Sequence, residues 1–292
     1  MSNDKIKQFE RWLVEEEKAS TTIVSYVGDV QAFHRFLCEK GNHEVTMTRF
    51  TFLKYKESLV GRGYAPSTIN KKVNSLKVYH DFLYSRGSLT QRFIELKRDR
   101  VQVASGSDHV VTALSEEQIE RLLFFIEDGS KVSVRNKLII YLLLYTGVRV
   151  TELVTIKLID LDRMTGILTV RGKGGKLREL SLRTDVLELV HEYQRSERQE
   201  SKFSDSSYLF VSQRASKMHR DAVRELLARL SFWVGIHLHP HLFRHTFCTQ
   251  LLRKGVELTT VSKLAGHSSV NMTAKYYIQT TREDKRKAVE LL

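Results

Sequence analysis

The sequence predicts a mainly α-helical protein of two domains, with a small antiparallel sheet in the second. The chain has 292 residues, and a typical domain of roughly 100–200 residues makes two domains the expectation. It contains only two prolines, the residue that most disfavours a helix interior. Apolar residues recur every three or four positions through most of the first hundred residues, and hydrophobic residues make up 41% of the chain, enough for substantial cores.

Four helices are expected in the N-terminal domain. They cover residues 5–17, 20–41, 48–63 and 65–87, each with an apolar stripe at helical spacing. Ser20 or Thr21 is a candidate N-cap for the second helix, and Gly41 is a candidate stop. Pro66, a residue favoured in a first helical turn, begins the fourth. We therefore expect a four-helix domain over residues 1–95.

A change in composition separates the two domains. Residues 96–111 are polar and basic and contain a Ser-Gly-Ser tripeptide, which is typical of a linker. The second domain is therefore expected over residues 112–292. It opens with a predicted helix over residues 112–127, for which Ser115 is the expected cap, and the acidic residues that follow suit the positive end of a helix.

The second domain also contains the predicted sheet. Residues 136–161 are strongly apolar and are expected to form a buried helical stretch with a break at Gly147. In residues 166–182, ILTV and LREL flank the glycine-rich segment RGKGGK, which predicts a β-hairpin with lysines at its tip. From Thr184 onward the chain is expected to be helical except around residues 208–212.

The charge of the chain points to a polyanionic partner. The formal net charge is +13 and the pI is near 9.7, which favours nucleic acid or an anionic membrane as partner. No run approaches the ~20 apolar residues that span a bilayer, and the N-terminus does not resemble a signal peptide. The two cysteines, Cys38 and Cys248, are far apart and lack metal-type spacing, so a reducing, cytoplasmic location is expected.

Three lysines of the fourth predicted helix are candidate DNA contacts. Lys71, Lys72 and Lys77 lie on its polar face. A charged helix face is commonly a solvated surface, but the same lysines can contact DNA phosphates. Both interpretations stay open on charge alone.

Four histidines lie close together in the stretch HLHPHLFRHTFC. A zinc site needs three or four ligands in tetrahedral array, and His237, His239 and His241 would share a face in an extended segment. Pro240 instead favours a helix that starts near His241 and places Arg244 on the same face. A guanidinium opposes a metal cation, whereas a helix N-terminus, an arginine and a histidine suit a phosphate. We therefore expect no metal and no cofactor.

Three more motifs carry residues suited to phosphate chemistry. TGVRVTEL places Arg149 shortly after a glycine, with Glu152 three residues later. RGKGGK places Lys173 at the predicted hairpin tip. LAGHSSVNMTAKYY places His267 directly after a glycine and Tyr276 nine residues further on. Each motif alone is weak, because one arginine after a glycine or one tyrosine in a helix is most often structural.

Taken together and in this order, the motifs resemble those of the tyrosine recombinases, also called the phage integrase family. TGVRVTEL resembles the first arginine box, RGKGGKLREL the catalytic lysine hairpin, HPHLFRHTF the His-x-x-Arg box and LAGHSSV the second histidine box. The similarity is closest to Xer-type and transposon- or phage-encoded members. The N-terminal helices resemble the core-binding, SAM-like DNA-binding domain of the family, so the resemblance covers nearly the whole chain.

The resemblance implies cleavage and rejoining of DNA strands through a 3′-phosphotyrosyl intermediate. Tyr276 would attack the scissile phosphate, and Lys173 would protonate the leaving 5′-oxygen. Covalent catalysis of this kind divides the exchange into two steps and preserves the phosphoester bond energy, so neither ATP nor a metal is needed. Tyr277 and Lys176 are the competing residues for these two roles, and the family spacing favours Tyr276 and Lys173. Lys176 would then contact the DNA backbone.

The remaining motif residues would stabilise the transition state. Arg149 and Arg244 would clamp the non-bridging phosphate oxygens, where developing charge needs stabilisation. His267 would hydrogen-bond a phosphate oxygen, and His241 would assist proton transfer at the tyrosine or bind phosphate. Glu152 would orient Arg149 or His241 rather than react.

The resemblance also implies the biological setting. The expected partner is double-stranded DNA with an inverted-repeat core site, bound by a homo-tetramer on paired sites, with a related recombinase or an accessory protein as further possible partners. Integration, excision and resolution are all compatible with it, in the bacterial cytoplasm at the nucleoid and without a membrane. The C-terminal residues 281–292 would either fold back or pass to a neighbouring protomer. Competing hypotheses are a type IB topoisomerase-like enzyme, a non-catalytic DNA-binding protein on the same fold and a zinc-dependent enzyme.

Overall fold

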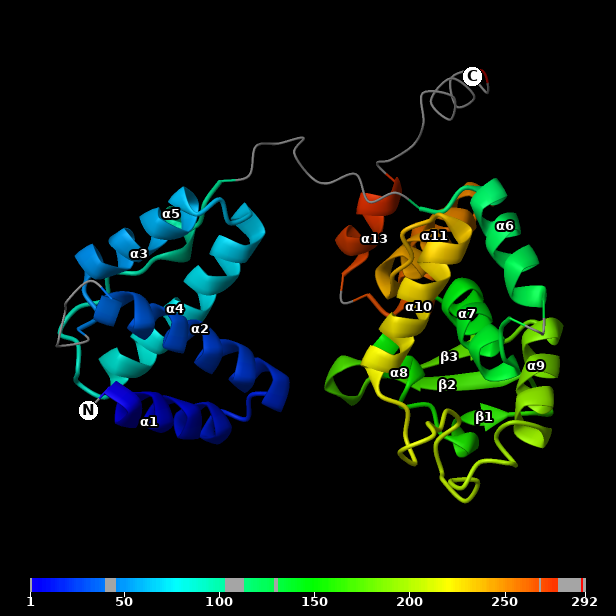
Figure 1. The fold of residues 1–292 in the computed structure, drawn as a ribbon. Coiled ribbons are helices and arrows are strands. Elements are labelled where there is room, and N and C mark those ends of the chain that lie inside the picture. Colours follow the sequence, from blue (N-terminus) through cyan, green and yellow to red (C-terminus); the bar gives the residue numbers. More distant parts are fainter. Residues whose placement is uncertain are drawn as a thin grey trace. The chain divides into compact units, whose positions relative to one another are not determined.

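The computed structural model describes residues 2–39, 46–102, 113–128, 131–267, 269–277 and 290. They belong to two compact units, Met1–Asp108 and His109–Leu292, each with its own hydrophobic core (Figure 1). The predicted fold class is confirmed, since both units are mainly helical and the second contains a small antiparallel sheet. No helix in the described ranges is both long enough and apolar enough to cross a bilayer.

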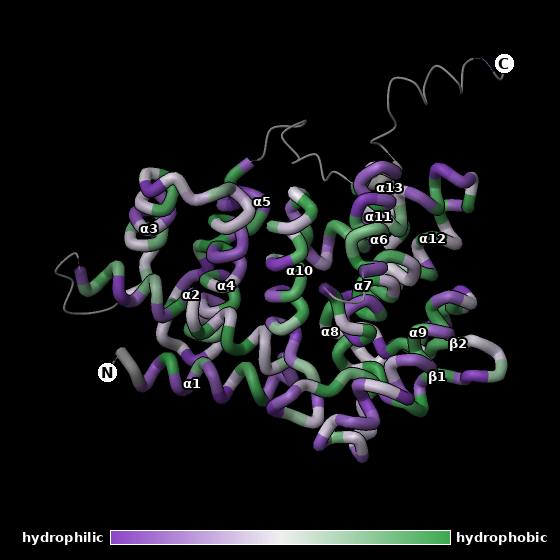
Figure 2. Tube along the Cα trace, turned by 45° about the vertical axis from the view of Figure 1, so that its right-hand side comes forward, coloured by the Kyte–Doolittle hydropathy of each residue, from purple (hydrophilic) through white to green (hydrophobic). Residues whose placement is uncertain are grey.

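The first unit is built from four long helices and one short one. They are α1 (Ser2–Glu15), α2 (Ser20–Glu39), α3 (Arg49–Gly61), α4 (Pro66–Ser85) and α5 (Leu96–Asp99). Fully buried aromatic rings fill its centre, and the ring of Phe9 meets the edge of Tyr79 at a centroid distance of 5.0 Å. In Figure 2 hydrophilic and hydrophobic segments alternate along α1, as expected of a helix with one face on a core.

The residues at the starts of α3 and α4 are of types that favour the beginning of a helix. Thr48 caps α3, because its side chain accepts a hydrogen bond from the backbone N–H of Thr51. Pro66 is the first residue of α4, where its missing N–H costs nothing. Ser20 is the first helical residue of α2 rather than its cap. The expected stop at Gly41 lies outside the described residues.

The segment expected to be a linker, residues 96–111, is partly folded. Leu96–Asp99 forms helix α5, and both Leu96 and Val101 pack on the core of the first unit. The carboxylate of Asp99 is buried and accepts hydrogen bonds from the Arg49 guanidinium at 2.7 Å and from the backbone N–H of Glu95 at 2.8 Å. At least one charged residue of this stretch, Asp99, therefore belongs to a buried ion pair. Composition alone does not distinguish such a residue from one in a solvated linker.

The second unit combines helices with a three-stranded sheet. Its helices are α6 (Glu116–Glu127), α7 (Val134–Thr146), α8 (Val150–Leu153), α9 (Thr184–Arg195), α10 (Arg220–Val234), α11 (Pro240–Arg253), α12 (Leu258–Ala265) and α13 (Val270–Tyr277). The strands β1 (Leu161–Asp162), β2 (Ile167–Arg171) and β3 (Leu177–Ser181) are antiparallel in the order β1-β2-β3. Helix α7 is buried on nearly every side and packs against α9 and α11.

Several predicted features of this unit are present. Ser115 caps α6 in a capping box with Gln118. Gly147 ends α7 in the left-handed conformation, with φ +59°. The predicted hairpin is formed by β2 and β3, in which Arg171 pairs with Leu177 around the glycine-rich tip. Helix α11 begins at Pro240, as expected from the proline.

The expectation of helix from Thr184 onward is wrong for residues 196–207 and 213–219, which contain no helix or strand, whereas the exception expected around residues 208–212 is confirmed. This segment is rich in serine, whose hydroxyls bond to nearby backbone and favour turns over helix. The Ser206 hydroxyl donates to the carbonyl of Ser216, and the Ser212 hydroxyl oxygen accepts from the backbone N–H of Ala215. The segment is thus a loop held together by its own side chains.

We expect the variant Asp99→Asn to destabilise the first unit by about 1–3 kcal/mol, because it removes the charge that the half-exposed Arg49 guanidinium and a backbone N–H stabilise. Urea unfolding of the full chain would be followed by the fluorescence of Trp12, which packs on this core, in a Trp233→Phe background. Glu57→Gln is the control, since Glu57 forms an exposed pair with Lys54 whose loss costs about 0.5 kcal/mol. Equal effects of both substitutions would show that α5 does not stabilise the unit.

Candidate active site

The centre of the site is the carboxylate of Glu152, which lies on α8 and is almost fully buried. It accepts hydrogen bonds from the backbone N–H of Arg149 at 2.8 Å and from the Arg149 guanidinium at 2.8 Å. The guanidinium of Arg178, on β3, donates to both of its oxygens at 2.8 and 3.1 Å. Burial raises the pKa of this carboxyl, but the hydrogen bonds from Arg178 and Arg149 outweigh it and hold the pKa below its usual value.

Arg149 precedes α8 and reaches two separate parts of the unit. One terminal nitrogen pairs with Glu152, and the other donates to the carbonyl of Gly266 at 2.9 Å. Gly266 ends α12 in the left-handed conformation, with φ +64°. About a third of the Arg149 side chain remains exposed, so the guanidinium is fixed in position but still accessible from solvent.

Arg178 was not among the candidate residues from the sequence. Its Nε donates to the carbonyl of Leu264 at 2.9 Å, so it ties β3 to α12 while it pairs with Glu152. A Cβ at Gly266 would lie 3.0–3.1 Å from the Arg178 side chain, so the backbone at Gly266 and this side chain pack closely together. Strand alternation could have indicated this role, because Arg178 shares a face with the buried Leu180, and a charge on a buried face needs a partner.

Arg244 lies on the first turns of α11 and is buried. Its Nη1 donates to the carbonyl of Gly147 at 2.8 Å. A Cβ at Gly147 would overlap the ring of Phe247, so only glycine fits both the left-handed conformation and the space. The carbonyl that holds Arg244 therefore lies two residues before Arg149, and both arginines come to the same region of the unit.

His267 follows Gly266 directly and completes this region. Its Nδ1 lies 2.7 Å from the hydroxyl of Thr273, a buried residue of α13. Burial, together with the nearby positive charges of Arg244 and Arg149, lowers the pKa of His267 to about 4. The ring is therefore neutral at pH 7, and when the Thr273 hydroxyl donates to Nδ1, Nε2 carries the proton and can donate.

The histidines of HLHPHLFRHTFC have different environments. His239 caps α11, with its Nδ1 accepting from the backbone N–H of Leu242 at 3.2 Å. His241 lies on the first turn with its side chain accessible to solvent, and partial burial of the ring together with the charges of Arg244 and Arg149 lowers its pKa. Burial and the neighbouring His241 lower the pKa of His245 to about 4. Within the part of the chain that the structure describes, no three His, Cys, Asp or Glu side chains form a group that could hold a metal ion.

The lysine hairpin lies beside the carboxylate. A Cβ at Gly172 would be 3.7 Å from the Glu152 carboxylate, so the backbone of the hairpin tip begins against this site. Lys173 is the next residue in the chain and starts a short 3-10 turn; its side chain lies outside the described part of the structure. Lys176 closes the tip, where its carbonyl accepts from the N–H of Gly172 at 2.7 Å, and its side chain is exposed.

The two candidate nucleophiles occupy the end of α13. Tyr276 and Tyr277 are the last two residues of this helix, which packs on α11 and α12, and their side chains lie outside the described part of the structure. Thr273, three and four residues earlier, faces His267. The candidate tail at residues 281–292 is also outside the described residues, apart from position 290.

The three candidate DNA-contact lysines of α4 differ in exposure. Lys72 is mostly buried and pairs with the buried carboxylate of Asp29 at 3.0 Å. Lys77 pairs with Asp81 one turn away at 2.5 Å. Lys71 lies 3.4 Å from the second Asp29 oxygen but stays more than half exposed. Their role at DNA stays a prediction, with Lys71 the most accessible of the three.

We expect Glu152→Gln to lower the free energy of unfolding by about 3 kcal/mol at pH 7, because two arginines lose their buried counter-charge. Since the folded pKa of Glu152 is depressed, its stabilisation is present above the unfolded pKa of about 4.3 and is lost as the pH falls through the folded value. The difference in the free energy of unfolding between the variant and the unmodified protein should therefore become smaller as the pH is lowered. Urea titrations at several pH values measure it.

Glu179→Gln is the matched control for that experiment, because Glu179 neighbours Arg178 on β3 but is exposed. It should change stability by less than about 0.5 kcal/mol. If Glu152→Gln behaved like this control at neutral pH, the carboxylate would not be what holds the two arginines.

Comparison with known proteins assigns both units to one family. A family model described as the phage integrase family matches residues 112–283, and one described as the phage integrase N-terminal SAM-like domain matches residues 6–87. A TnP I resolvase of Bacillus thuringiensis is 31% identical over 94% of each chain. The tyrosine recombinase XerA of Pyrococcus furiosus is 30% identical over 99% of this chain and 94% of its own.

Structural comparison agrees with this assignment at the level of the fold. A crystal structure of the XerH site-specific recombinase, bound to a palindromic difH substrate in a post-cleavage complex, matches 100% of this chain and 84% of its own. The TM-score is 0.76 at 22% identity. The first family model alone covers more than half of the sequence, and the two relatives align along nearly all of it. On these grounds the chain belongs to the phage integrase family of tyrosine recombinases.

Proposed function

We propose that this chain is a site-specific tyrosine recombinase that cleaves and rejoins DNA strands through a 3′-phosphotyrosyl intermediate. One observation carries the proposal: Arg149 and Arg244, far apart in sequence, are each fixed by the carbonyl of a left-handed glycine, beside His241 and His267. Such a group of cationic and neutral donors suits a phosphate that gains charge during the reaction.

The two arginines are proposed to clamp the non-bridging oxygens of the scissile phosphate. Each guanidinium has five N–H donors, and the carbonyl and carboxylate contacts occupy only some of those of Arg149. Fixing the arginines before DNA binds lowers the reorganisation needed in the transition state. Glu152 is proposed as a positioning residue, because it contacts both Arg149 and Arg178 through its buried carboxylate.

The histidines are proposed to act as neutral groups. A ring with its pKa near 4, as in His267, can donate one hydrogen bond to a phosphate oxygen at neutral pH without carrying a charge. His241 also has a lowered pKa, so its neutral ring can accept the tyrosine proton as the phenolate forms. The surrounding arginines favour that phenolate, since nearby positive charge stabilises an anion.

Tyr276 is proposed as the nucleophile. At about 100° per residue, positions 276 and 277 lie on either side of the α13 face that carries Thr273. The spacing from His267 in the family motif favours Tyr276. Tyr277 is then a packing residue.

DNA is the proposed partner, and the relatives support it. The XerH recombinase is bound to a palindromic difH substrate in its structure, and the two aligned relatives are named as a resolvase and a tyrosine recombinase. A topoisomerase-like or non-catalytic role is not favoured, because these relatives align along nearly the whole chain. We place the protein in the cytoplasm, at the nucleoid, and propose an inverted-repeat core site with the first unit, through Lys71, and the hairpin, through Lys176, contacting its backbone.

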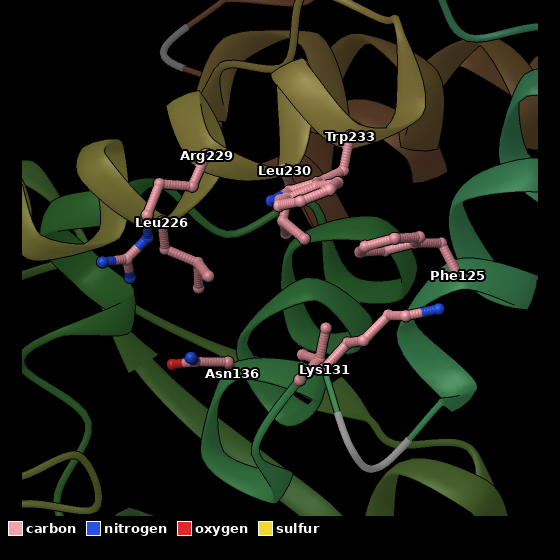
Figure 3. A pocket seen from close by; sticks show the side chains of 8 residues that line it. Phe125, Lys131, Asn136, Leu226, Arg229, Leu230 and Trp233 are labelled. Atoms are coloured by element: carbon pink, nitrogen blue, oxygen red, sulfur yellow. The ribbon is translucent and has the colours of Figure 1, made fainter.

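Assembly as a homo-tetramer on paired sites is proposed from an aromatic surface, which consists of the exposed Phe232 and Trp233 and the half-buried Phe125. Phe232 and Trp233 on α10 are 81% and 65% exposed. The Trp233 ring stacks on Phe125 of α6 at a centroid distance of 6.3 Å and meets the edge of Phe232 at 5.6 Å. Figure 3 shows the Phe125 and Trp233 rings at one end of a hollow that also contains Arg229 and Asn136. Exposed aromatic rings of this kind commonly mark protein interfaces.

We expect the full chain, incubated in EDTA with a nicked substrate that carries a site it binds, to form an SDS-resistant adduct. Tyr276→Phe should abolish the adduct because the attacking oxygen is gone, whereas Tyr277→Phe should retain it. Mass spectrometry of the attached peptide identifies the residue. An adduct at Tyr277 would move the nucleophile, and no adduct at a bound site would favour a non-catalytic role. Loss of the adduct in EDTA alone would favour a metal-dependent enzyme.

Lys173→Ala should slow cleavage of normal DNA by about 10²-fold or more, because the leaving 5′-oxygen loses its proton donor. A substrate with a 5′-bridging sulfur, which leaves without protonation, should restore the rate in single-turnover assays. Lys176→Ala is the matched control from the same hairpin and should show no such rescue pattern. Rescue of Lys176→Ala instead would exchange the two assignments.

The double variant Phe232→Ser and Trp233→Ser should weaken assembly on paired sites by about tenfold or more, because interface energy concentrates in buried aromatic residues. Binding of one protein to a single half-site should stay unchanged. Analytical ultracentrifugation of the DNA complexes separates the two effects. Ile159→Ser with Met164→Ser, which are also exposed apolar residues, is the control. Equal assembly by both double variants would exclude the aromatic surface as the interface.

A further inference from the structure

A second basic site in the second unit lies between the C-terminal part of α9, the turn before β2 and the start of the loop that follows α9. A hollow of about 290 Å³ is lined by Leu158, Arg163, His191, Gln194, Arg195 and Arg198. We call this hollow, with its three arginines and His191, the arginine pocket. No acidic side chain lines this hollow, and among the described residues none of its three arginines forms an ion pair with a carboxylate.

Arg198 organises the loop around the arginine pocket. Its side chain is 94% buried, as its residue retains 6% of its surface. The guanidinium donates to the carbonyl of Ser204 at 2.8 Å, to that of Tyr208 at 3.1 Å and to that of Ser206. These bonds use both terminal nitrogens, and Nε is buried with no hydrogen-bond partner among the described residues. A buried donor without a partner costs about 1–3 kcal/mol, so the folded loop retains an unmet donor.

The arginine pocket is separate from the candidate active site. Arg163 lies in the turn before β2, whereas Lys173 lies beyond the other end of this five-residue strand, which spans about 17 Å. Arg195 is the last residue of α9. In Figure 1 the loop of residues 196–219 lies below the sheet, and α13 lies at the opposite end of the same unit. The residues of the pocket are thus not part of the group around Glu152.

We propose that the arginine pocket binds a phosphate group. Three arginines line one hollow that no carboxylate lines, so their positive charges repel one another, and an oxyanion between them removes that repulsion. The guanidinium forks of Arg163 and Arg195 match the oxygens of phosphate, Arg198 adds its positive charge and its Nε donor, and the exposed His191 adds a further donor. The phosphate could belong to a free ion or nucleotide, or to the backbone of a DNA segment that passes this face. Both sources share the same chemistry, and the inference does not depend on the proposed recombinase activity.

The test uses the full chain labelled with ¹⁵N-arginine and inorganic phosphate as the probe. The Nε–H signals of Arg163 and Arg195 are assigned by their loss in Arg163→Ala and Arg195→Ala. We expect both signals to shift with phosphate and to saturate, with a millimolar Kd. In each variant the remaining signal should report a Kd raised about tenfold, since a charge-assisted hydrogen bond is lost. Arg183→Ala with Arg214→Ala, which removes two exposed charges elsewhere in the unit, is the control.

Three results distinguish the outcomes. The double variant Arg163→Ala with Arg195→Ala can also be tested for DNA binding at several salt concentrations. If the slope of log K against log salt falls by about two relative to the control, the phosphate belongs to DNA. If that dependence is unchanged while phosphate still binds, the pocket takes a free phosphate. Signals that do not move with phosphate, or that move equally with acetate, would overturn the proposal.

Discussion

The buried carboxylate of Glu152 is the contact on which the arrangement of the catalytic unit depends. It joins the start of α8 to β3 through Arg149 and Arg178, and both arginines continue to α12 through backbone carbonyls. A buried ion group of this kind adds little net stability over well-packed apolar residues, but breaking it leaves uncompensated charge inside the protein. Its main effect is therefore on geometry, since it fixes the position of the partly exposed Arg149 guanidinium.

The histidines gain their character from the same arrangement. Because Arg149 and Arg244 lie close by, protonating His267 or His241 would add a third positive charge to a partly desolvated region. The rings are held neutral, and the positive charge that meets an incoming phosphate comes from the arginines alone. The unit thereby separates charge stabilisation from proton transfer, although both kinds of residue lie together.

Much of this could be predicted from the sequence, and the failures have physical causes. Periodicity located α1 to α4. Gly147 marked the end of α7 because glycine tolerates the left-handed conformation, and Pro240 marked the start of α11 because its ring fixes φ. Arg178 was missed because its partners, Glu152 and Leu264, are distant in sequence. The linker was extended too far for the same reason, since the pairing of Asp99 with Arg49 spans fifty residues. Residues 196–207 and 213–219 form a loop in place of the expected helix, because serine hydroxyls in this segment bond to nearby backbone.

The two arginines that point to phosphate chemistry are each held by a carbonyl of the main chain, at Gly266 and at Gly147. Every residue type supplies a carbonyl, so no side-chain replacement at positions 266 or 147 can delete the acceptor itself. What replacement can change is the backbone conformation, since both glycines have positive φ and Gly147 has no room for a Cβ. During divergence of such proteins, the tolerance of the arginine geometry to mutation therefore depends, beside Glu152, on two residues that have no functional group at all.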